Sequence, residues 1–223
     1  MGKLTFSGSG TSGPIGAWDD VTPSANEEAH GTATAGTAAG AANAASSANR
    51  FVYDYTAMDG LAIKAAYTPS GGVGKVESST EIGALYTGID GLSIYAAMGE
   101  NNDQPTSGIT GKSDLTAFVV TYAMGAITVG VQTSEKDVSG GATSDTESSA
   151  FGLSYVVSDD LSVSVGSHEI EYNSGDDQEA FGVSASYTMG SLTIGAAMNS
   201  VDNIANTATN DRSAYELGLT FAF

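Results

Sequence analysis

The last residues of the chain place the strictest limit on what it can fold into. In residues 215–223, every second position is apolar and the positions between are small or polar. Successive side chains of a β-strand point to opposite faces, so this segment predicts a strand with one wholly apolar face. A strand that ends on an exposed Phe favours contact with lipid, because chain ends in water usually fray. The apolar positions are Tyr215, Leu217, Leu219, Phe221 and Phe223.

The same alternation recurs along the chain, for example in residues 192–198 and 161–165, and no segment has a convincing helical period. We therefore predict an all-β chain of about twelve strands, which fits the even strand numbers of single-chain outer-membrane barrels. The expected strands are 2–9, 50–57, 61–68, 79–88, 91–99, 114–123, 126–133, 149–157, 160–170, 179–188, 191–199 and 213–223.

The connections between these strands are of two alternating kinds. One kind is tight and is typified by Asp59-Gly60 and Asp90-Gly91, where Gly supplies the positive φ of a short hairpin. The other kind is long and polar, at residues 69–79, 99–113, 134–148, 171–178 and 200–212. The strands of a β-sandwich also alternate apolar and polar side chains. Tight turns at one end of the strands and long loops at the other are, however, typical of an antiparallel transmembrane β-barrel.

Tyrosines mark the ends of several expected strands. Near the tight turns stand Tyr55, Tyr86, Tyr122, Tyr155 and Tyr187, whereas Tyr67 lies at the opposite end of its strand. The repeated position favours an aromatic girdle at a membrane interface. The alternative is the general preference of Tyr for strands.

Composition excludes several classes of protein. There is no Cys, and 26 acidic against 7 basic residues give a formal net charge of −19, which argues against nucleic-acid binding. No apolar run is long enough for a transmembrane helix, and no signal peptide is visible. His30 and His168 form no metal signature, and the acidic loops at 101–103 and 175–177 lack the ligand spacing of a dedicated Ca²⁺ loop. We expect no enzyme activity, no metal and no cofactor.

Residues 10–49 break the strand pattern. A connection of this length is usually functional or disordered. Its Ala-, Gly- and Ser-rich part suits a mobile surface loop, but Pro14, Ile15 and Trp18 near its start favour a loop that packs against something.

The segment Met1–Phe6, the acidic loop, and residues 50–55 and 60–67 together resemble the trimeric general porins of Gram-negative outer membranes. The resemblance spans the chain, although each motif is short. It implies a sixteen-stranded barrel with a loop folded into the pore, a homotrimer, passive diffusion of small hydrophilic solutes, and a terminal Phe that the outer-membrane assembly machinery reads. In that family the inward loop follows the fifth strand, whereas here it follows the first. The chain therefore corresponds either to a fragment that lacks four strands or to a twelve-stranded relative.

Because successive side chains alternate between the two faces of a strand, several charged residues and one His are expected on the face opposite the apolar rows, as in a lumen. They are Lys3, Asp54, Glu81, His168 and Glu216. Arg50 and Lys64 share this face. The resemblance implies that these two basic residues face four loop carboxylates across a pore constriction. The alternative is that all of them are simply solvated. The carboxylates are those of Asp19, Asp20, Glu27 and Glu28.

The sequence thus predicts one domain, residues 1–223, with residues 10–49 as a candidate constriction loop. We expect an outer-membrane porin that passes small hydrophilic solutes and prefers cations, with the lipid bilayer and its own copies as partners. The alternatives are a structural or adhesive barrel without channel activity, and a secreted acidic β-domain.

Overall fold

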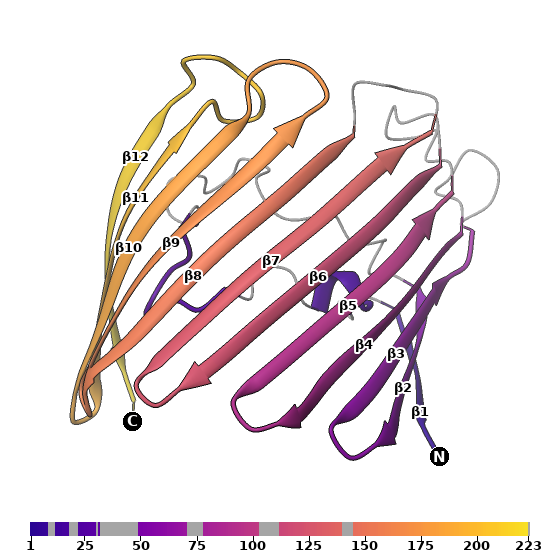
Figure 1. Ribbon diagram of the computed structural model, residues 1–223, viewed down its shortest axis with the longest axis horizontal. Helices are drawn as coiled ribbons and strands as arrows, with labels where there is room; N and C mark the ends of the chain where they lie inside the picture. The colour runs from indigo at the N-terminus through magenta and orange to yellow at the C-terminus, as the bar shows by residue number, and fades with distance from the viewer. Residues whose placement is uncertain are drawn as a thin grey trace. The chain divides into compact units, whose positions relative to one another are not determined.

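A computed structural model describes residues 1–8, 12–17, 22–29, 31, 49–70, 78–102, 112–139 and 145–222. Within these residues the chain forms twelve antiparallel strands and one short 3₁₀ helix, η1 (Ile15–Ala17) (Figure 1). The strands are β1 (Lys3–Ser7), β2 (Arg50–Met58), β3 (Leu61–Thr68), β4 (Ser79–Ile89), β5 (Leu92–Asn101), β6 (Ser113–Met124), β7 (Ile127–Val138), β8 (Thr146–Ser158), β9 (Leu161–Tyr172), β10 (Gln178–Met189), β11 (Leu192–Asp202) and β12 (Arg212–Phe221).

Each strand pairs with the next one along the chain, so the order in the sheet is β1 to β12, with β1 and β12 at its two ends. The chain divides into two compact units. The first comprises Met1–Asp19, Gly40–Val120 and Thr133–Glu147, and the second Asp20–Ala39, Thr121–Gln132 and Ser148–Phe223. Strands β1–β5 belong wholly to the first unit and β9–β12 wholly to the second.

The predicted strands are confirmed, and most of their limits agree with the prediction to within a few residues. The largest difference is at β7, where residues 134–138 extend a strand that was expected to end in a loop, and β8 and β11 are extended in the same way by residues 146–148 and 200–202. Backbone hydrogen bonding needs no apolar side chain, so a strand can continue after its apolar row has stopped. The tight turns form as expected, since Gly60 and Gly91 have φ of 75° and 74°.

One face of the strands exposes large apolar side chains. On β2, Phe51 and Tyr53 are each 41% exposed, whereas Val52 between them is 1% exposed. On β10, Phe181 is 50% exposed, whereas Ser184 on the opposite face is buried. Contiguous apolar rows of this kind are unfavourable in water and match the lipid-facing surface of a membrane barrel. Four of the five tyrosines expected near the tight turns are exposed, and Tyr86 is half-buried.

Among the described residues, no helix has the length and the apolar content that crossing a bilayer requires.

Candidate functional site

The connection between β1 and β2 contacts the polar face of the sheet through two short stretches. We call residues 12–17 the first anchor and residues 22–29 the second anchor. The first anchor belongs to the first unit and the second anchor to the second unit. Trp18, Asp19 and Asp20 lie outside the described residues.

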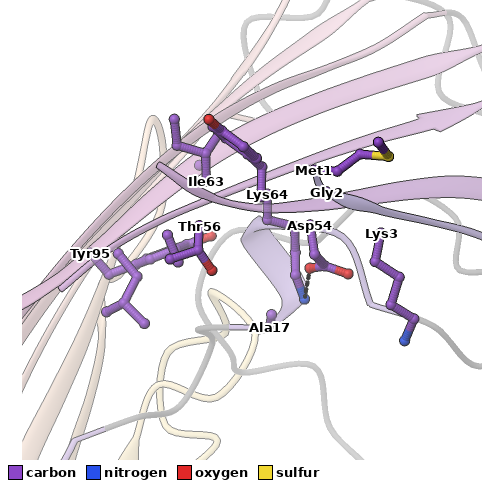
Figure 2. A pocket seen from close by; sticks show the side chains of 13 residues that line it. Met1, Gly2, Lys3, Ala17, Asp54, Thr56, Ile63, Lys64 and Tyr95 are labelled. Atoms are coloured by element: carbon purple, nitrogen blue, oxygen red, sulfur yellow. Dashed lines mark ion pairs between the residues drawn. The ribbon is translucent and has the colours of Figure 1, made fainter. Parts of the chain in front are cut away.

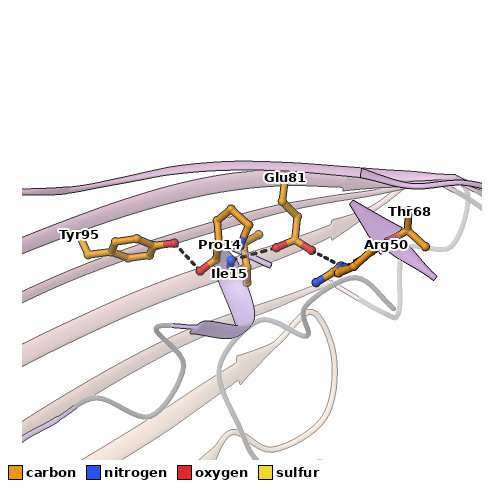
Figure 3. A network of polar contacts seen from close by, with 6 residues as sticks. All are labelled: Pro14, Ile15, Arg50, Thr68, Glu81 and Tyr95. Carbon is orange, nitrogen blue, oxygen red and sulfur yellow. Dashed lines mark hydrogen bonds and ion pairs between the residues drawn. The ribbon is translucent and has the colours of Figure 1, made fainter. Parts of the chain in front are cut away.

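The first anchor is held against β4 and β5 by buried polar contacts. The backbone N–H of Ile15 donates to Glu81 Oε2 at 3.0 Å, and the Tyr95 hydroxyl donates to the carbonyl oxygen of Pro14 (Figure 3). Ile15 itself is 1% exposed. The anchor is therefore held by one buried apolar side chain, by one backbone N–H that donates to the wall and by one backbone carbonyl that accepts from it.

Glu81 also binds Arg50, the first residue of β2. Arg50 Nη2 lies 2.8 Å from Glu81 Oε1, and Arg50 Nε donates to Thr68 Oγ1 at 3.3 Å. Both charged side chains are buried, so each needs its partner to offset the cost of leaving water. The Arg50–Glu81 pair thus joins three strands and a loop. Glu81 is on β4, pairs with Arg50 on β2 and accepts a hydrogen bond from the first anchor, while Arg50 donates to Thr68 on β3.

Small residues under the first anchor allow its close approach. A Cβ atom on Gly83 would come within 2.9 Å of Pro14 Cβ, and one on Gly99 within 3.0 Å of Ile15 Cδ1. Larger residues at these positions would push the anchor away from the wall.

Hydroxyl groups hold the second anchor. The backbone N–H of Ala25 donates to Ser164 Oγ at 2.9 Å, and that of Asn26 donates to Ser184 Oγ at 3.0 Å. The two serines are directly opposed on β9 and β10, and their hydroxyls lie 2.7 Å apart. On β11, Asn199 Nδ2 donates to the Glu28 carbonyl oxygen at 2.6 Å.

Glycines beside these serines leave room for the backbone of the second anchor. A Cβ on Gly182 would lie 2.7 Å from Ala29 Cα, and one on Gly152 would lie 2.8 Å from the Pro23 carbonyl oxygen. The strands in this unit therefore combine two features on one face: glycines that admit a backbone and hydroxyls that bond to it.

The remaining predicted site residues have different surroundings. Lys64 Nζ lies 3.7 Å from Asp54 Oδ1, and both side chains are partly exposed. His168 is buried, with its Nε2 atom 3.0 Å from Ser148 Oγ, whereas Glu216 is exposed on β12. Of the expected assembly signal, Tyr215, Leu217, Leu219 and Phe221 form an exposed apolar row, and Phe223 lies outside the described residues.

The structure thus gives Arg50 and Lys64 partners on the wall itself. Arg50 pairs with Glu81 on β4, and Lys64 pairs with Asp54 on β2. The sequence had placed these four residues on one face without pairing them. That the two basic residues face the loop carboxylates stays a prediction. Glu27 and Glu28 lie in the second anchor and are half-buried.

Sequence reasoning missed the residues that hold the anchors, namely Tyr95, Ser164, Ser184 and Asn199. Each occupies an alternate, non-lipid position of a strand, which the pattern does reveal. The sequence does not indicate which loop atom each of these side chains contacts, because the anchors lie in a segment without a repeating pattern of apolar and polar residues.

A third basic residue of the first unit is also paired. Lys112 Nζ lies 2.6 Å from Glu100 Oε2 and 3.5 Å from Asp114 Oδ1. The hydrogen bond to Glu100 raises the pKa of the Lys112 ammonium group. Within the described ranges, no His, Asp and Glu side chains gather in a group that could hold a metal ion.

A ladder of antiparallel strands that exposes large apolar side chains on one face and carries a packed connection on the other is typical of membrane-embedded β-barrel proteins. The family model described as Gram-negative porin matches residues 2–223, and the chain belongs to this family. A search of curated protein sequences found no significant match.

Solved structures share the fold at low sequence identity. OmpT, an outer-membrane protein of Vibrio cholerae, is 19% identical, with a TM-score of 0.65 over 100% of this chain and 77% of that one. A porin structure refined at 1.8 Å is 16% identical, with a TM-score of 0.72 over 100% and 78%. The anion-selective porin from Comamonas acidovorans is 12% identical, with a TM-score of 0.67 over 79% and 60%.

Membership of this family identifies an outer-membrane porin, a membrane-embedded channel for small solutes rather than an enzyme, and the solved structures share its fold.

Proposed function

We propose that this porin is a passive, cation-preferring diffusion channel whose pore is narrowed by residues 10–49. The observation that carries the proposal is the attachment of both anchors to the polar face, through Glu81 and Tyr95 in one unit and through Ser164 and Ser184 in the other. A connection held on the polar face occupies space that would otherwise belong to the lumen. It is therefore the segment that sets the local width of the pore.

The cation preference rests on the charge of this segment. Residues 10–49 contain Asp19, Asp20, Glu27 and Glu28 and no Lys or Arg. Arg50 opposes these charges only weakly, because Glu81 already neutralises it. Lys64 lies 3.7 Å from Asp54 and adds only one positive charge against the four carboxylates. A narrow passage with low-dielectric walls concentrates the field of its carboxylates. The field extends only about 8 Å at physiological salt, so the preference is moderate and weakens as salt rises.

The fold does not determine whether a porin prefers cations or anions, so the ion selectivity of this porin is the quantity to measure. The neighbour from Comamonas acidovorans has the same fold and is named an anion-selective porin. Selectivity in such barrels is set by the side chains that line the pore.

The same proposal includes a homotrimer in the outer membrane and recognition of the terminal strand by the assembly machinery. The support is the exposed apolar row of β12, which ends at Phe221 among the described residues.

The test is a reversal potential across a planar bilayer under a KCl gradient. The unmodified protein is compared with a loop variant, D19N/D20N/E27Q/E28Q, and with a control of matched charge change, D59N/D90N/D159N/D160N, in the tight turns. We expect cation selectivity that the loop variant reduces and the control leaves intact. An anion-selective pore, or a loop variant with an unmoved potential, contradicts the proposal. Folded protein that gives no ohmic steps would favour the structural or adhesive alternative.

A further inference from the structure

Three charged residues form a row across the first three strands. The pairing register sets Lys3 opposite Asp54, and Asp54 opposite Lys64. Cross-strand partners share a face, so the three side chains alternate in sign, positive, negative and positive, on the polar face of the first unit. The next position in the row, on β4, is Gly83, which adds no side chain.

This row borders a cavity of about 710 Å³. Ala17, at the end of the first anchor, and Tyr95 also line the cavity. Figure 2 shows Lys64 and Asp54 directed toward each other on the same side of the strands as Ala17 and Lys3. The volume lies in the range of small-molecule sites.

The two ammonium groups are available to a solute. Lys3 is exposed, and it makes no ion pair with any residue in the described part of the chain. Lys64 lies 3.7 Å from Asp54, near the limit of an ion pair, and its side chain is 31% exposed. The row therefore has a local charge of +1 in a chain of formal charge −19.

We propose that this cavity is a transient binding site for small dicarboxylate solutes. Neighbouring strands lie about 4.8 Å apart, so the Cα atoms of Lys3 and Lys64 are separated by two such spacings. Two flexible lysine side chains at this separation can each contact one carboxylate of a four-carbon dicarboxylate. A monocarboxylate engages only one of them, and Asp54 between the lysines repels any carboxylate placed centrally. The site rests on the proposed channel function for its access to solute.

The experiment measures block of the single-channel K⁺ current by succinate, with butyrate and butane-1,4-diol as singly charged and uncharged controls. Variants K3Q and K64Q remove one ammonium group each, and D54N removes the opposing carboxylate. K136Q is the matched control, because Lys136 is on β7 and does not line the cavity. Assembly of each variant is checked by heat-modifiable migration in gels.

We expect succinate to block at lower concentration than butyrate. Each lysine variant should raise the half-blocking concentration about threefold, as for a partly exposed charge pair. D54N should lower it, and K136Q should leave it unchanged. Equal block by succinate in the unmodified, K3Q and K64Q pores, or weaker block in D54N, overturns the proposal.

A second readout separates this site from the channel itself. Saturation-transfer NMR of succinate with the folded protein in detergent measures binding without conductance. If the protein forms no conducting pore but shows lysine-dependent transfer, the channel proposal fails and the site stands. If the pore conducts but K3Q and K64Q change neither block nor transfer, the site fails and the channel stands.

Discussion

Arg50 Nη2 and Glu81 Oε1 lie 2.8 Å apart, and each of these side chains is only 1% exposed. The second oxygen of Glu81 accepts a hydrogen bond from the Ile15 N–H. This carboxylate therefore couples the stability of the wall to the position of the first anchor. A change in either residue should affect both.

Replacing Arg50 by Met should leave Glu81 buried without its cation. Loss of one partner of a buried pair costs about 3–5 kcal/mol. We expect Arg50→Met to lower the temperature at which the barrel loses heat-modifiable migration. The double variant R50M/E81Q should recover much of this loss, because Gln is neutral and still accepts the hydrogen bond from Ile15. A double variant no more stable than R50M would contradict the role of the pair.

The second anchor should be displaced by side chains on the glycines beneath it. A Cβ on Gly182 would already come within 2.7 Å of Ala29 Cα, so Gly182→Val should push the anchor off the wall and raise the single-channel conductance. Gly218→Val is the matched control, because a Cβ there meets nothing within 4 Å. Unchanged conductance in Gly182→Val, or an equal increase in Gly218→Val, would show that the second anchor does not narrow the pore.

The two faces of β11 should tolerate charge differently. Ile194 pairs with Tyr187 and Leu219 in the apolar row, whereas Thr193 lies on the other face near Thr188. A cation facing lipid at the bilayer midplane costs about 2–4 kcal/mol. Ile194→Arg should therefore block membrane assembly, and Thr193→Arg should be tolerated. The amount of heat-modifiable protein in membranes measures both, and equal tolerance would reverse the assignment of faces.

Removal of Phe223 should reduce membrane assembly strongly, although it shortens the chain by only one residue. It continues the apolar row of Tyr215, Leu217, Leu219 and Phe221. We expect its deletion to lower the folded fraction in outer membranes while total synthesis stays constant, and Phe223→Tyr to retain assembly. Equal folded fractions in the deletion variant and the unmodified chain would remove this residue from the assembly signal.

The alternation of apolar and small residues was sufficient to predict the strands, because one face of each strand must meet lipid, and this assigns every strand residue to one of the two faces. It was not sufficient at the long-loop ends, where β7 continues through residues 134–138, beyond its apolar row. The pattern predicted that the charged residues lie on the non-lipid face of their strands, but it could not predict their pairing, which depends on the register between strands. Neither Arg50–Glu81 nor Lys64–Asp54 is adjacent in sequence, so their contacts become visible only once the strands are aligned.

The candidate site was less predictable than the fold. Ser164 and Ser184 look like ordinary members of a polar row, and Pro23 and Ala25 look like ordinary loop residues. Their contacts join segments more than a hundred residues apart, as the 139-residue separation of Ala25 and Ser164 illustrates. Such contacts form where glycines permit a backbone to approach, and the alternating pattern does not distinguish a glycine beneath a loop from one facing water.

Only four residues, 18–21, separate the two anchors in the sequence. The two attachments of the connection are therefore tethered to each other, like the two binding modules of a bivalent ligand. When one of two tethered contacts is released, the other keeps it at a high effective concentration, so it rebinds quickly. Complete departure of the connection requires both contacts to be lost together. With the constriction proposed for residues 10–49, we therefore expect thermal opening at either anchor to change the width of the passage only briefly, and a lasting wide state to need a perturbation at both anchors.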